Sequence, residues 1–338
     1  MKRIEWVDTL KGIGIILMVL GHYPAFSYTG KALILIYSFH MPLFLFIGGY
    51  LFSDIKDHKE LFGKLKNNVR SLAVPYFGFS IISLVFSWPE SGQVASNYLY
   101  GIFCGLGTEN LPNVPLWFLT FYFTGRCMFS LIVYLANVIG KNRRAVKEGV
   151  LFLLTFVLIA AAYVYRLKLY KPRLPWNPEM SALCMGFYYM GYQFRHFNRK
   201  RELPVIWKPV LCGLAFALWF PVALYGTRVD INASYFGRGM WYFYFAASLG
   251  LIWCVGLSHF LSRLKPARIV LNYLGQNSLY VVGFHIPMNF VAGAVVLPFM
   301  PAAVQSAYTT KSLTGILFTV ITTILLSLIA GYLWKEVE

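Results

Sequence analysis

Charged side chains are scarce in this sequence: Asp, Glu, Lys and Arg together make up 13% of its 338 residues. A soluble domain usually carries about a quarter charged residues. Apolar residues reach 58% and the mean hydropathy is +0.59, which is more apolar surface than one globular core can bury. An ordinary soluble protein is therefore excluded. A disordered chain is excluded as well, because aromatic residues make up 18% of this sequence.

Acidic residues are the scarcest charged type, with 13 Asp and Glu against 30 Lys and Arg and a net charge of +17. In a membrane protein such an excess marks cytoplasmic loops and favours contact with anionic lipids. No DNA-binding motif surrounds a basic stretch, so we expect lipid rather than nucleic acid as the charged partner. The five cysteines show no CxxC spacing and the histidines no HxxH or HExxH spacing, so we expect no metal site.

Long apolar runs dominate the rest of the chain. A helix that crosses the hydrocarbon layer needs about 20 mainly apolar residues. This criterion predicts an all-α polytopic membrane protein with a single transmembrane domain over 1–338 and no separate soluble domain. The ten predicted spans are 9–28, 32–53, 71–88, 115–138, 149–168, 180–197, 207–225, 239–261, 276–298 and 313–334.

The loops between these spans predict the orientation of the chain. If the N-terminus is cytoplasmic, most loop Lys and Arg residues fall on the inner side, with the basic segment 166–173 as an exception. This distribution predicts that both termini are cytoplasmic. The longest non-spanning stretch, 89–114, then lies outside; it contains Glu109 and no Lys or Arg.

The first span carries three polar side chains that lipid would disfavour, Asp8, Lys11 and His22. Asp8 and Lys11 are three positions apart and can form an ion pair on a helix. Lys11 and His22 are eleven positions apart, which places them on one helix face and about 16 Å apart along the axis. Gly14 and Gly21 lie close to that face, where their lack of a side chain leaves room for a backbone or a ligand.

Other spans carry polar groups at similar depth. His40 precedes Pro42, which should kink the second span. His285 lies near the middle of the ninth span after Ser278 and Tyr280, and Arg126 lies near the middle of the fourth. A membrane histidine can also serve only as a hydrogen-bond partner of a neighbouring helix, and for His285 and Arg126 that role stays open.

At these residues the sequence resembles the membrane-bound acyltransferase 3 family, in particular its fucose 4-O-acetylase-like branch. The matching pieces occur in the family's order along the chain. They are Asp8-x-x-Lys11-Gly12-Ile13, Gly21-His22, Phe39-His40-Met41-Pro42-Leu43-Phe44 with Gly48-Gly49-Tyr50, Pro115-Leu116-Trp117-Phe118-Leu119, and Leu274-Gly275-Gln276-Asn277-Ser278-Leu279-Tyr280 leading to His285.

The resemblance implies an enzyme of the bacterial cytoplasmic membrane that moves an acyl group, usually acetyl from acetyl-CoA, to a hydroxyl of a cell-envelope carbohydrate or a related acceptor. The family's basic residue is often Arg, whereas this chain has Lys11, which keeps the charge but cannot make a bidentate contact. We assign three groups of candidate residues. They are His22, His40 and His285 for catalysis, Asp8, Lys11 and Arg126 for donor binding, and Trp117, Glu109, Ser278 and Tyr280 for the acceptor side or for support.

The chemistry also follows from the residues themselves. A neutral imidazole can take the proton of a sugar hydroxyl as that hydroxyl attacks a thioester carbonyl. Alternatively, His22 can attack the thioester itself and carry the acetyl group. The oxyanion needs a donor, for which His40, Ser278, Tyr280 and Arg126 are candidates. Two non-enzymatic hypotheses remain at this point: a transporter of sugars or lipid-linked precursors, and a non-catalytic membrane subunit of a polysaccharide synthase.

Overall fold

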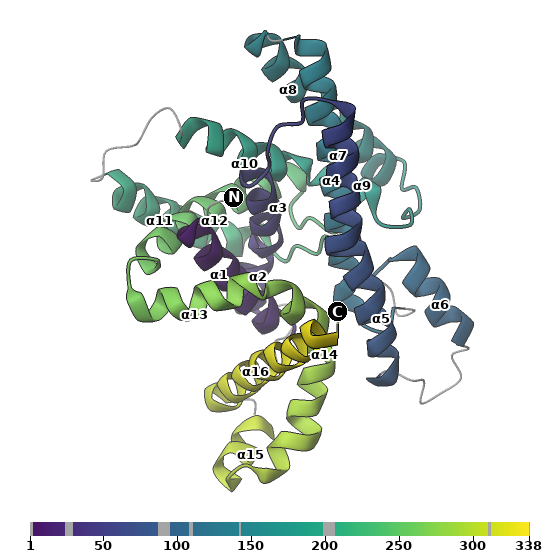
Figure 1. Cartoon of the computed structure of the whole chain (residues 1–338). Helices are drawn as coiled ribbons and strands as arrows, with labels where there is room; N and C mark the ends of the chain where they lie inside the picture. The colour runs from purple at the N-terminus through teal and green to yellow at the C-terminus, as the bar shows by residue number, and fades with distance from the viewer. Residues whose placement is uncertain are drawn as a thin grey trace. The chain divides into compact units, whose positions relative to one another are not determined.

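The computed structural model of the chain describes residues 3–23, 30–86, 95–107, 111–141, 143–198, 207–309 and 312–337. Within these ranges the chain is helical almost throughout, and it forms no strand apart from one isolated bridge between Asp230 and Tyr235. The helices are drawn in Figure 1. The expected all-α membrane architecture is confirmed.

Eight helical stretches of the described residues are long and apolar enough to cross a membrane. Each corresponds to one of the predicted spans, with ends that differ by a few residues in most cases and by 13 at the start of the second stretch. They are Lys31–Tyr50, His58–Phe86, Val114–Gly140, Arg144–Lys168, Pro209–Gly226, Met240–Leu261, Ser278–Phe299 and Leu313–Glu336.

The remaining two predicted spans form shorter helices. Helix α1 covers Glu5–Gly21, only 17 residues, and residues 24–28 of the predicted first span lie outside the described residues. The predicted span 180–197 is divided at Cys184 into α9 (Pro178–Leu183) and α10 (Met185–Asn198). The total of ten spans and the cytoplasmic position of both termini therefore stay predictions.

The chain packs as two compact units that are discontinuous in sequence. The first contains Met1–Phe44, Leu203–Asp230 and Tyr235–Glu338, and the second contains Leu45–Glu202 and Ile231–Ser234. The boundary falls within helix α3 (His40–Tyr50).

The first unit is built on pairs of neighbouring helices. Helix α1 packs along α13, α11 packs on α12, and α14 packs on α16 with α15 at their end, as Figure 1 shows for the last three. Besides α1, the helices of this unit are α2 (Lys31–Tyr37), α11 (Trp207–Gly226), α12 (Met240–Leu261), α13 (Lys265–Gln276), α14 (Ser278–Val291), α15 (Ala302–Thr309) and α16 (Leu313–Val337).

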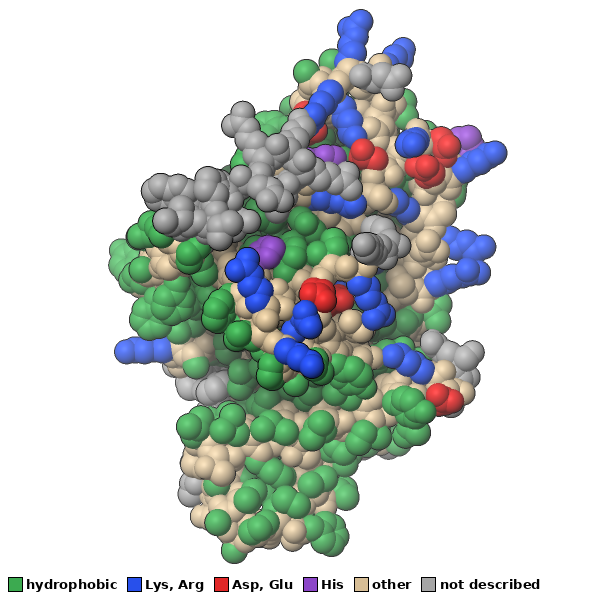
Figure 2. All heavy atoms as spheres, turned by 60° about the vertical axis from the view of Figure 1, so that its left-hand side comes forward, with side chains coloured by type: hydrophobic (Ala, Val, Ile, Leu, Met, Phe, Trp, Pro, Cys, Tyr) green, Lys and Arg blue, Asp and Glu red, His purple; other side chains and the backbone are tan. Residues whose placement is uncertain are grey.

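Part of the first unit has a surface typical of lipid contact. On the face in Figure 2, the end formed by α15 and the adjoining parts of α14 and α16 shows hydrophobic side chains and no charged ones. Phe299, Leu313 and Leu317 are among the exposed residues of this part, at 83%, 72% and 51%. Large apolar side chains remain exposed to this degree because they face hydrocarbon rather than water.

The second unit has α7 at its centre, since α7 packs on α4, α8, α9 and α10. A π-helical turn at Val69–Ala73 joins α4 to α5. The helices of this unit are α4 (His58–Asn68), α5 (Val74–Phe86), α6 (Ala95–Cys104), α7 (Trp117–Gly140), α8 (Arg144–Tyr163), α9 and α10.

The second predicted span breaks where its sequence requires it. Pro42 has no amide hydrogen and its ring collides with the carbonyl four residues earlier, that of Ser38. The chain leaves the helix at Ser38 and Phe39 and resumes it at His40. The indole nitrogen of Trp219 on α11 donates to the Ser38 hydroxyl at 3.0 Å. The predicted kink is therefore confirmed, and it lies three to four residues before the proline itself.

Helices α1 and α13 approach each other so closely that two positions admit only glycine. A Cβ added to Gly12 would collide with the backbone of Leu271, and one added to Gly275 would collide with the backbone carbonyl of Asp8. The side chains of Thr9 and Asn272 are hydrogen-bonded across the same interface at 2.8 Å. The two motif pieces that contain these glycines are thus brought together although more than 260 residues separate them.

Candidate active site

His22 is the first residue after helix α1. Its backbone has φ −97° and ψ 5°, outside the helical region, and its imidazole Nδ1 lies 2.8 Å from the carbonyl oxygen of Met18. A carbonyl only accepts, so Nδ1 must carry the hydrogen and donate it. The other ring nitrogen, Nε2, is then left with its lone pair, which is the form that a general base needs.

His285 on α14 lies against His22. The two ring centroids are 5.1 Å apart and the ring planes make an angle of 61°, so the rings meet edge to face. Nδ1 of His285 lies 3.1 Å and 3.0 Å from the carbonyl oxygens of Val281 and Val282. These contacts fix the same tautomer as in His22. The side chain is 1% exposed and its Nε2 is buried without a hydrogen-bond partner.

His40 completes a group of three histidines within the first unit. It begins α3, is buried, and places Nδ1 at 2.9 Å from the carbonyl oxygen of Ile36. Its ring packs on Tyr37 at 4.9 Å between centroids, and the Tyr37 ring lies against the α-carbon of Gly21. Tyr37 therefore links the His40 ring to the end of α1, where His22 follows Gly21.

The space beside Gly14 and Gly21 is occupied by protein. Side chains of Leu43 and Phe44 lie where a Cβ of Gly14 would be, and Tyr37 and Ile36 do the same at Gly21. These glycines admit the chain that carries His40 rather than a ligand.

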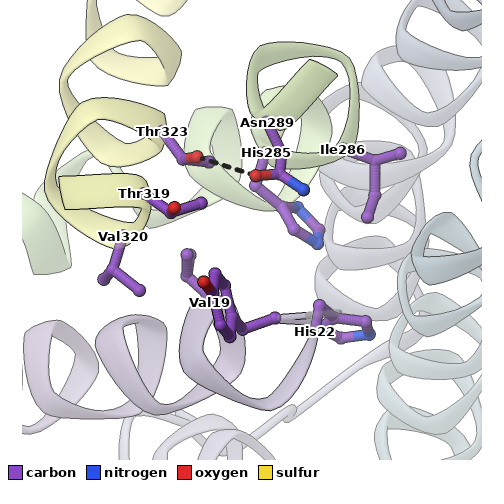
Figure 3. Close-up of a pocket in the computed structure, with 9 residues that line it drawn as sticks. Val19, His22, His285, Ile286, Asn289, Thr319, Val320 and Thr323 are labelled. Atoms are coloured by element: carbon purple, nitrogen blue, oxygen red, sulfur yellow. Dashed lines mark hydrogen bonds between the residues drawn. The ribbon is translucent and has the colours of Figure 1, made fainter. Parts of the chain in front are cut away.

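A small pocket opens between α1, α14 and α16 at the two histidines (Figure 3). Its volume is about 10 Å³, enough for one water molecule, so a substrate can enter only if side chains move. The residues that line it are Val19, His22, Tyr23, His285, Ile286, Asn289, Thr319, Val320 and Thr323.

Asn289 and Thr323 are pocket residues that sequence reasoning missed. The Thr323 hydroxyl donates to Oδ1 of Asn289 at 3.4 Å, and Figure 3 shows the amide nitrogen of Asn289 turned to the other side. Asn289 follows His285 by four positions and so shares its helix face. This four-residue spacing from His285 could have identified Asn289 from the sequence. Thr323 lies in a strongly apolar helix whose partner cannot be read from sequence.

The opposite end of α1 holds the predicted donor-binding pair. Nζ of Lys11 lies 3.8 Å from Oδ1 of Asp8, so the predicted ion pair is present. Oδ2 of Asp8 also accepts a hydrogen bond at 3.3 Å from Nε2 of Gln276, at the end of α13. The first and last motif pieces therefore share one polar cluster.

Ser278 and Tyr280 lie in the first turn of α14, away from the histidines. Ser278 precedes His285 by seven positions, about 10 Å along the axis. Tyr280 faces α16, where its side chain lies against Gly331 and Nζ of Lys335 is 4.7 Å from its ring centroid. Neither residue is brought to the pocket, so neither is placed to donate to an oxyanion there.

Arg126 and Trp117 belong to α7 in the second unit. The Arg126 guanidinium lies 6.0 Å from the ring centroid of Tyr122. Trp117 is 6% exposed and packs against Phe121 at 5.4 Å between centroids. A buried indole of this kind has little face left for a sugar. Glu109 lies outside the described residues.

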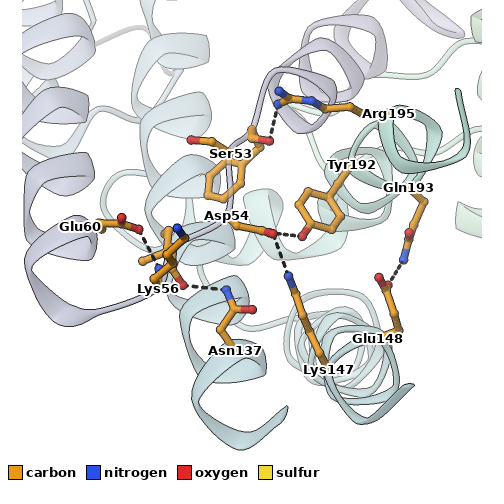
Figure 4. Close-up of polar contacts among 12 residues, drawn as sticks. Ser53, Asp54, Lys56, Glu60, Asn137, Lys147, Glu148, Tyr192, Gln193 and Arg195 are labelled. Atoms are coloured by element: carbon orange, nitrogen blue, oxygen red, sulfur yellow. Dashed lines mark hydrogen bonds and ion pairs between the residues drawn. The ribbon is translucent and has the colours of Figure 1, made fainter. Parts of the chain in front are cut away.

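A second polar cluster, in the second unit, fixes the segment between α3 and α4 (Figure 4). Asp54 pairs with Nζ of Lys147 at 3.0 Å and accepts a hydrogen bond from the Tyr192 hydroxyl. Burial raises the pKa of Asp54, but these two partners outweigh burial and hold that pKa below its ordinary value. Asn137 donates to the carbonyl of Ile55 at 2.6 Å and Arg195 to that of Phe52 at 2.8 Å. The cluster tethers this loop to α7, α8 and α10.

In the described part of the chain, no three His, Cys, Asp or Glu side chains are grouped so that they could hold a metal ion.

The helices define a multi-pass membrane protein, and two of them bring His22 and His285 together beside a pocket. A family model described as an acyltransferase domain matches residues 4–332. The chain belongs to that family, acyltransferase 3, and is a membrane acyltransferase. The match runs through both compact units. No curated protein matches the chain.

Proposed function

We propose that this protein transfers an acetyl group from cytoplasmic acetyl-CoA to a hydroxyl group of a cell-envelope carbohydrate, at the cytoplasmic membrane of a bacterium. The proposal rests on membership of the acyltransferase family and on one observation above all. His22 and His285 meet at 5.1 Å, and each donates Nδ1–H to its own helix. Two Nε2 lone pairs are thereby offered beside one pocket.

In the proposed reaction His22 is the base. Its Nε2 takes the proton of the acceptor hydroxyl while the hydroxyl oxygen bonds to the thioester carbonyl carbon. The tetrahedral intermediate then expels the CoA sulfur, which receives that proton from His22 and leaves as the free thiol. In the alternative route, Nε2 of His22 attacks the thioester carbonyl and expels CoA as the thiolate; the hydroxyl then attacks the acetyl-histidine and frees Nε2, and the hydroxyl proton protonates the thiolate.

The oxyanion of that intermediate needs a hydrogen-bond donor. Asn289 suits this role better than Ser278 or Tyr280, because it lines the pocket beside His285. The bond from Thr323 to Oδ1 turns the amide N–H groups of Asn289 away from α16. His285 keeps the His22 ring in place through its edge contact.

Lys11 lies about 16 Å from His22 along α1, near the predicted cytoplasmic end. There it can attract the phosphates of the donor while the thioester reaches the histidines. The carbohydrate acceptor follows from the resemblance to the fucose 4-O-acetylase-like branch.

Purified protein in lipid nanodiscs, supplied with radiolabelled acetyl-CoA and a cell-envelope glycan fraction, should release CoA thiol and label the glycan. His22→Ala should abolish both. The control is His259→Ala. His259 lies on α12, where its ring stacks on Trp6 of α1, and it does not line the pocket. Normal turnover by His22→Ala would refute the assignment of the base.

Two further measurements test the acyl-histidine route and the identity of the acceptor. Mass spectrometry of the labelled protein without acceptor should detect acetyl on His22 only if the acyl-histidine route operates. Cell-surface glycans from cells with and without the protein should differ in O-acetyl content, and identical glycans would exclude an envelope carbohydrate as the acceptor.

A further inference from the structure

Cationic side chains from the two ends of the sequence contact Gln276 and Asn277, where α13 ends and α14 begins. Arg3 donates to Oε1 of Gln276 at 3.0 Å, and Nζ of Lys335 donates to Oδ1 of Asn277 at 2.8 Å. Lys11 is linked to Gln276 through Asp8. The fourth cation, Arg268, lies two turns earlier on α13.

The charges of these four residues are not equally compensated. Asp8 pairs with Lys11 at 3.8 Å, and Glu5 pairs with Arg268 at 3.3 Å. Arg3 and Lys335 instead contact neutral amide oxygens, and within the described ranges neither has a carboxylate partner. The cluster therefore keeps two uncompensated positive charges.

The two amides that hold these cations are themselves oriented. Nε2 of Gln276 donates to Asp8 at 3.3 Å, so its oxygen is the atom left for Arg3. Nδ2 of Asn277 donates to the carbonyl of Tyr273 at 2.9 Å, so its oxygen is the atom left for Lys335. Two exposed cations held by consecutive residues suit a ligand with more than one phosphate group.

The distance from this cluster to the histidines matches one such ligand. Asn277 and His285 are eight residues apart on α14, about 12 Å, and Lys11 and His22 are about 16 Å apart on α1. The pantetheine arm of coenzyme A has roughly 13 bonds between phosphorus and sulfur, which span about 16 Å at the roughly 1.2 Å per bond of an extended chain. A thioester at His22 thus leaves the nucleotide end of the donor at this cluster.

We propose that Arg3 and Lys335 bind the 3′-phosphorylated adenosine diphosphate end of the acyl-CoA donor, an inference that rests on the proposed function. The family match ends at residues 4 and 332, so both side chains lie just outside it. Gln276 and Asn277 position the two cations, and Lys11 lies between them and the histidines on the path of the arm.

The test compares two donors in zwitterionic nanodiscs, acetyl-CoA and S-acetylpantetheine, the second of which lacks the nucleotide and every phosphate. Arg3→Gln and Lys335→Gln should each raise KM for acetyl-CoA about 5- to 10-fold, the range expected for loss of a charge-assisted contact at an exposed site. KM for S-acetylpantetheine should not change. The inhibition constant of adenosine 3′,5′-bisphosphate should rise together with KM for acetyl-CoA.

Lys265→Gln is the matched control. Lys265 is an exposed cation on the same helix, about 16 Å from Gln276, and its loss should leave both KM values unchanged. An equal effect of Lys265→Gln would show a diffuse field and overturn the proposal.

Three further results would also overturn it. One is a rise in both KM values with a lower melting temperature, which would mean that the two cations only anchor the chain ends. Another is an effect seen only in nanodiscs of anionic lipid, which would assign the cluster to lipid headgroups. The third is an unchanged KM for acetyl-CoA in both variants. Failure of the wild-type protein to release CoA from either donor would instead refute the proposed function.

Discussion

His22 and His285 should respond differently when each loses Nε2. Asparagine is the informative replacement, because its amide nitrogen lies near the position of Nδ1 and can keep the bond to the helix carbonyl. Loss of a general base lowers turnover about 10²- to 10⁴-fold, and this is the expected effect of His22→Asn. His285→Asn removes the edge contact at 5.1 Å, worth about 0.5–1.5 kcal/mol for an aromatic pair, so turnover should fall only about 2- to 12-fold.

The burial of the two rings supports this order. His285 is 1% exposed, whereas His22 is the more accessible of the two and lies at the end of its helix. The assay is CoA release at saturating acetyl-CoA, with KM and melting temperature recorded for both variants. If His285→Asn, folded and with an unchanged KM, lost as much turnover as His22→Asn, the assignment of His22 as base and His285 as its neighbour would be refuted.

Three other changes test separate parts of the structure. Thr323→Val removes the hydrogen-bond donor to Asn289 and should lower kcat of CoA release several-fold, which corresponds to about 1 kcal/mol. Thr323→Ser should restore kcat. A valine variant with full kcat would show that this hydrogen bond does not orient the Asn289 amide for catalysis. Gly12→Ala should lower the melting temperature, because the new Cβ meets the backbone of α13 at a cost of about 1–3 kcal/mol or more. Gly63→Ala should not, because nothing lies within 4 Å of its new Cβ. Equal melting temperatures of the two variants would contradict the close approach of α1 and α13. Asp54→Asn should lower the melting temperature at pH 7 by an amount equivalent to about 1 kcal/mol, because the side chain is 39% exposed. The folded-state pKa of Asp54 is lowered, so this contribution is present above the unfolded pKa of about 3.9 and is lost as pH falls through the folded value; a difference that persisted at pH 2 would contradict the ion pair.

Hydropathy predicted the membrane-spanning helices well because the hydrocarbon layer sets both their length and their composition. Hydropathy did not predict where the helix of span 180–197 is interrupted. The predicted span 180–197 is interrupted at Cys184, and no proline explains that break. At Pro42 the break was predicted correctly, since the missing amide and the ring collision act locally.

The candidate site was predictable to the extent that polar groups in apolar helices stand out. His22, His40 and His285 were found in this way; the structure brings His22 and His285 into contact and places His40 against Tyr37, which lies at Gly21. Ser278 and Tyr280 were included because of their motif, but Ser278 lies about two turns before His285 and Tyr280 packs against α16. Thr323 was missed because a threonine in a membrane helix usually bonds to its own backbone, and only the fold shows that it faces Asn289.

The close crossing of α1 and α13 explains why short motifs at the two ends of the sequence must occur together. Gly12 and Gly275 let the two backbones touch, and this contact brings Gln276 to Asp8 and Arg3. From that crossing, α1 leads to His22 and the chain after α13 leads into α14 and His285. A helix is a stiff rod with a fixed rise per residue, so the spacing along both helices sets the distance between cations and imidazoles. If the proposed donor is correct, its phosphates and thioester are separated by the same distance, whereas a free acetate or a shorter thioester should engage only one end.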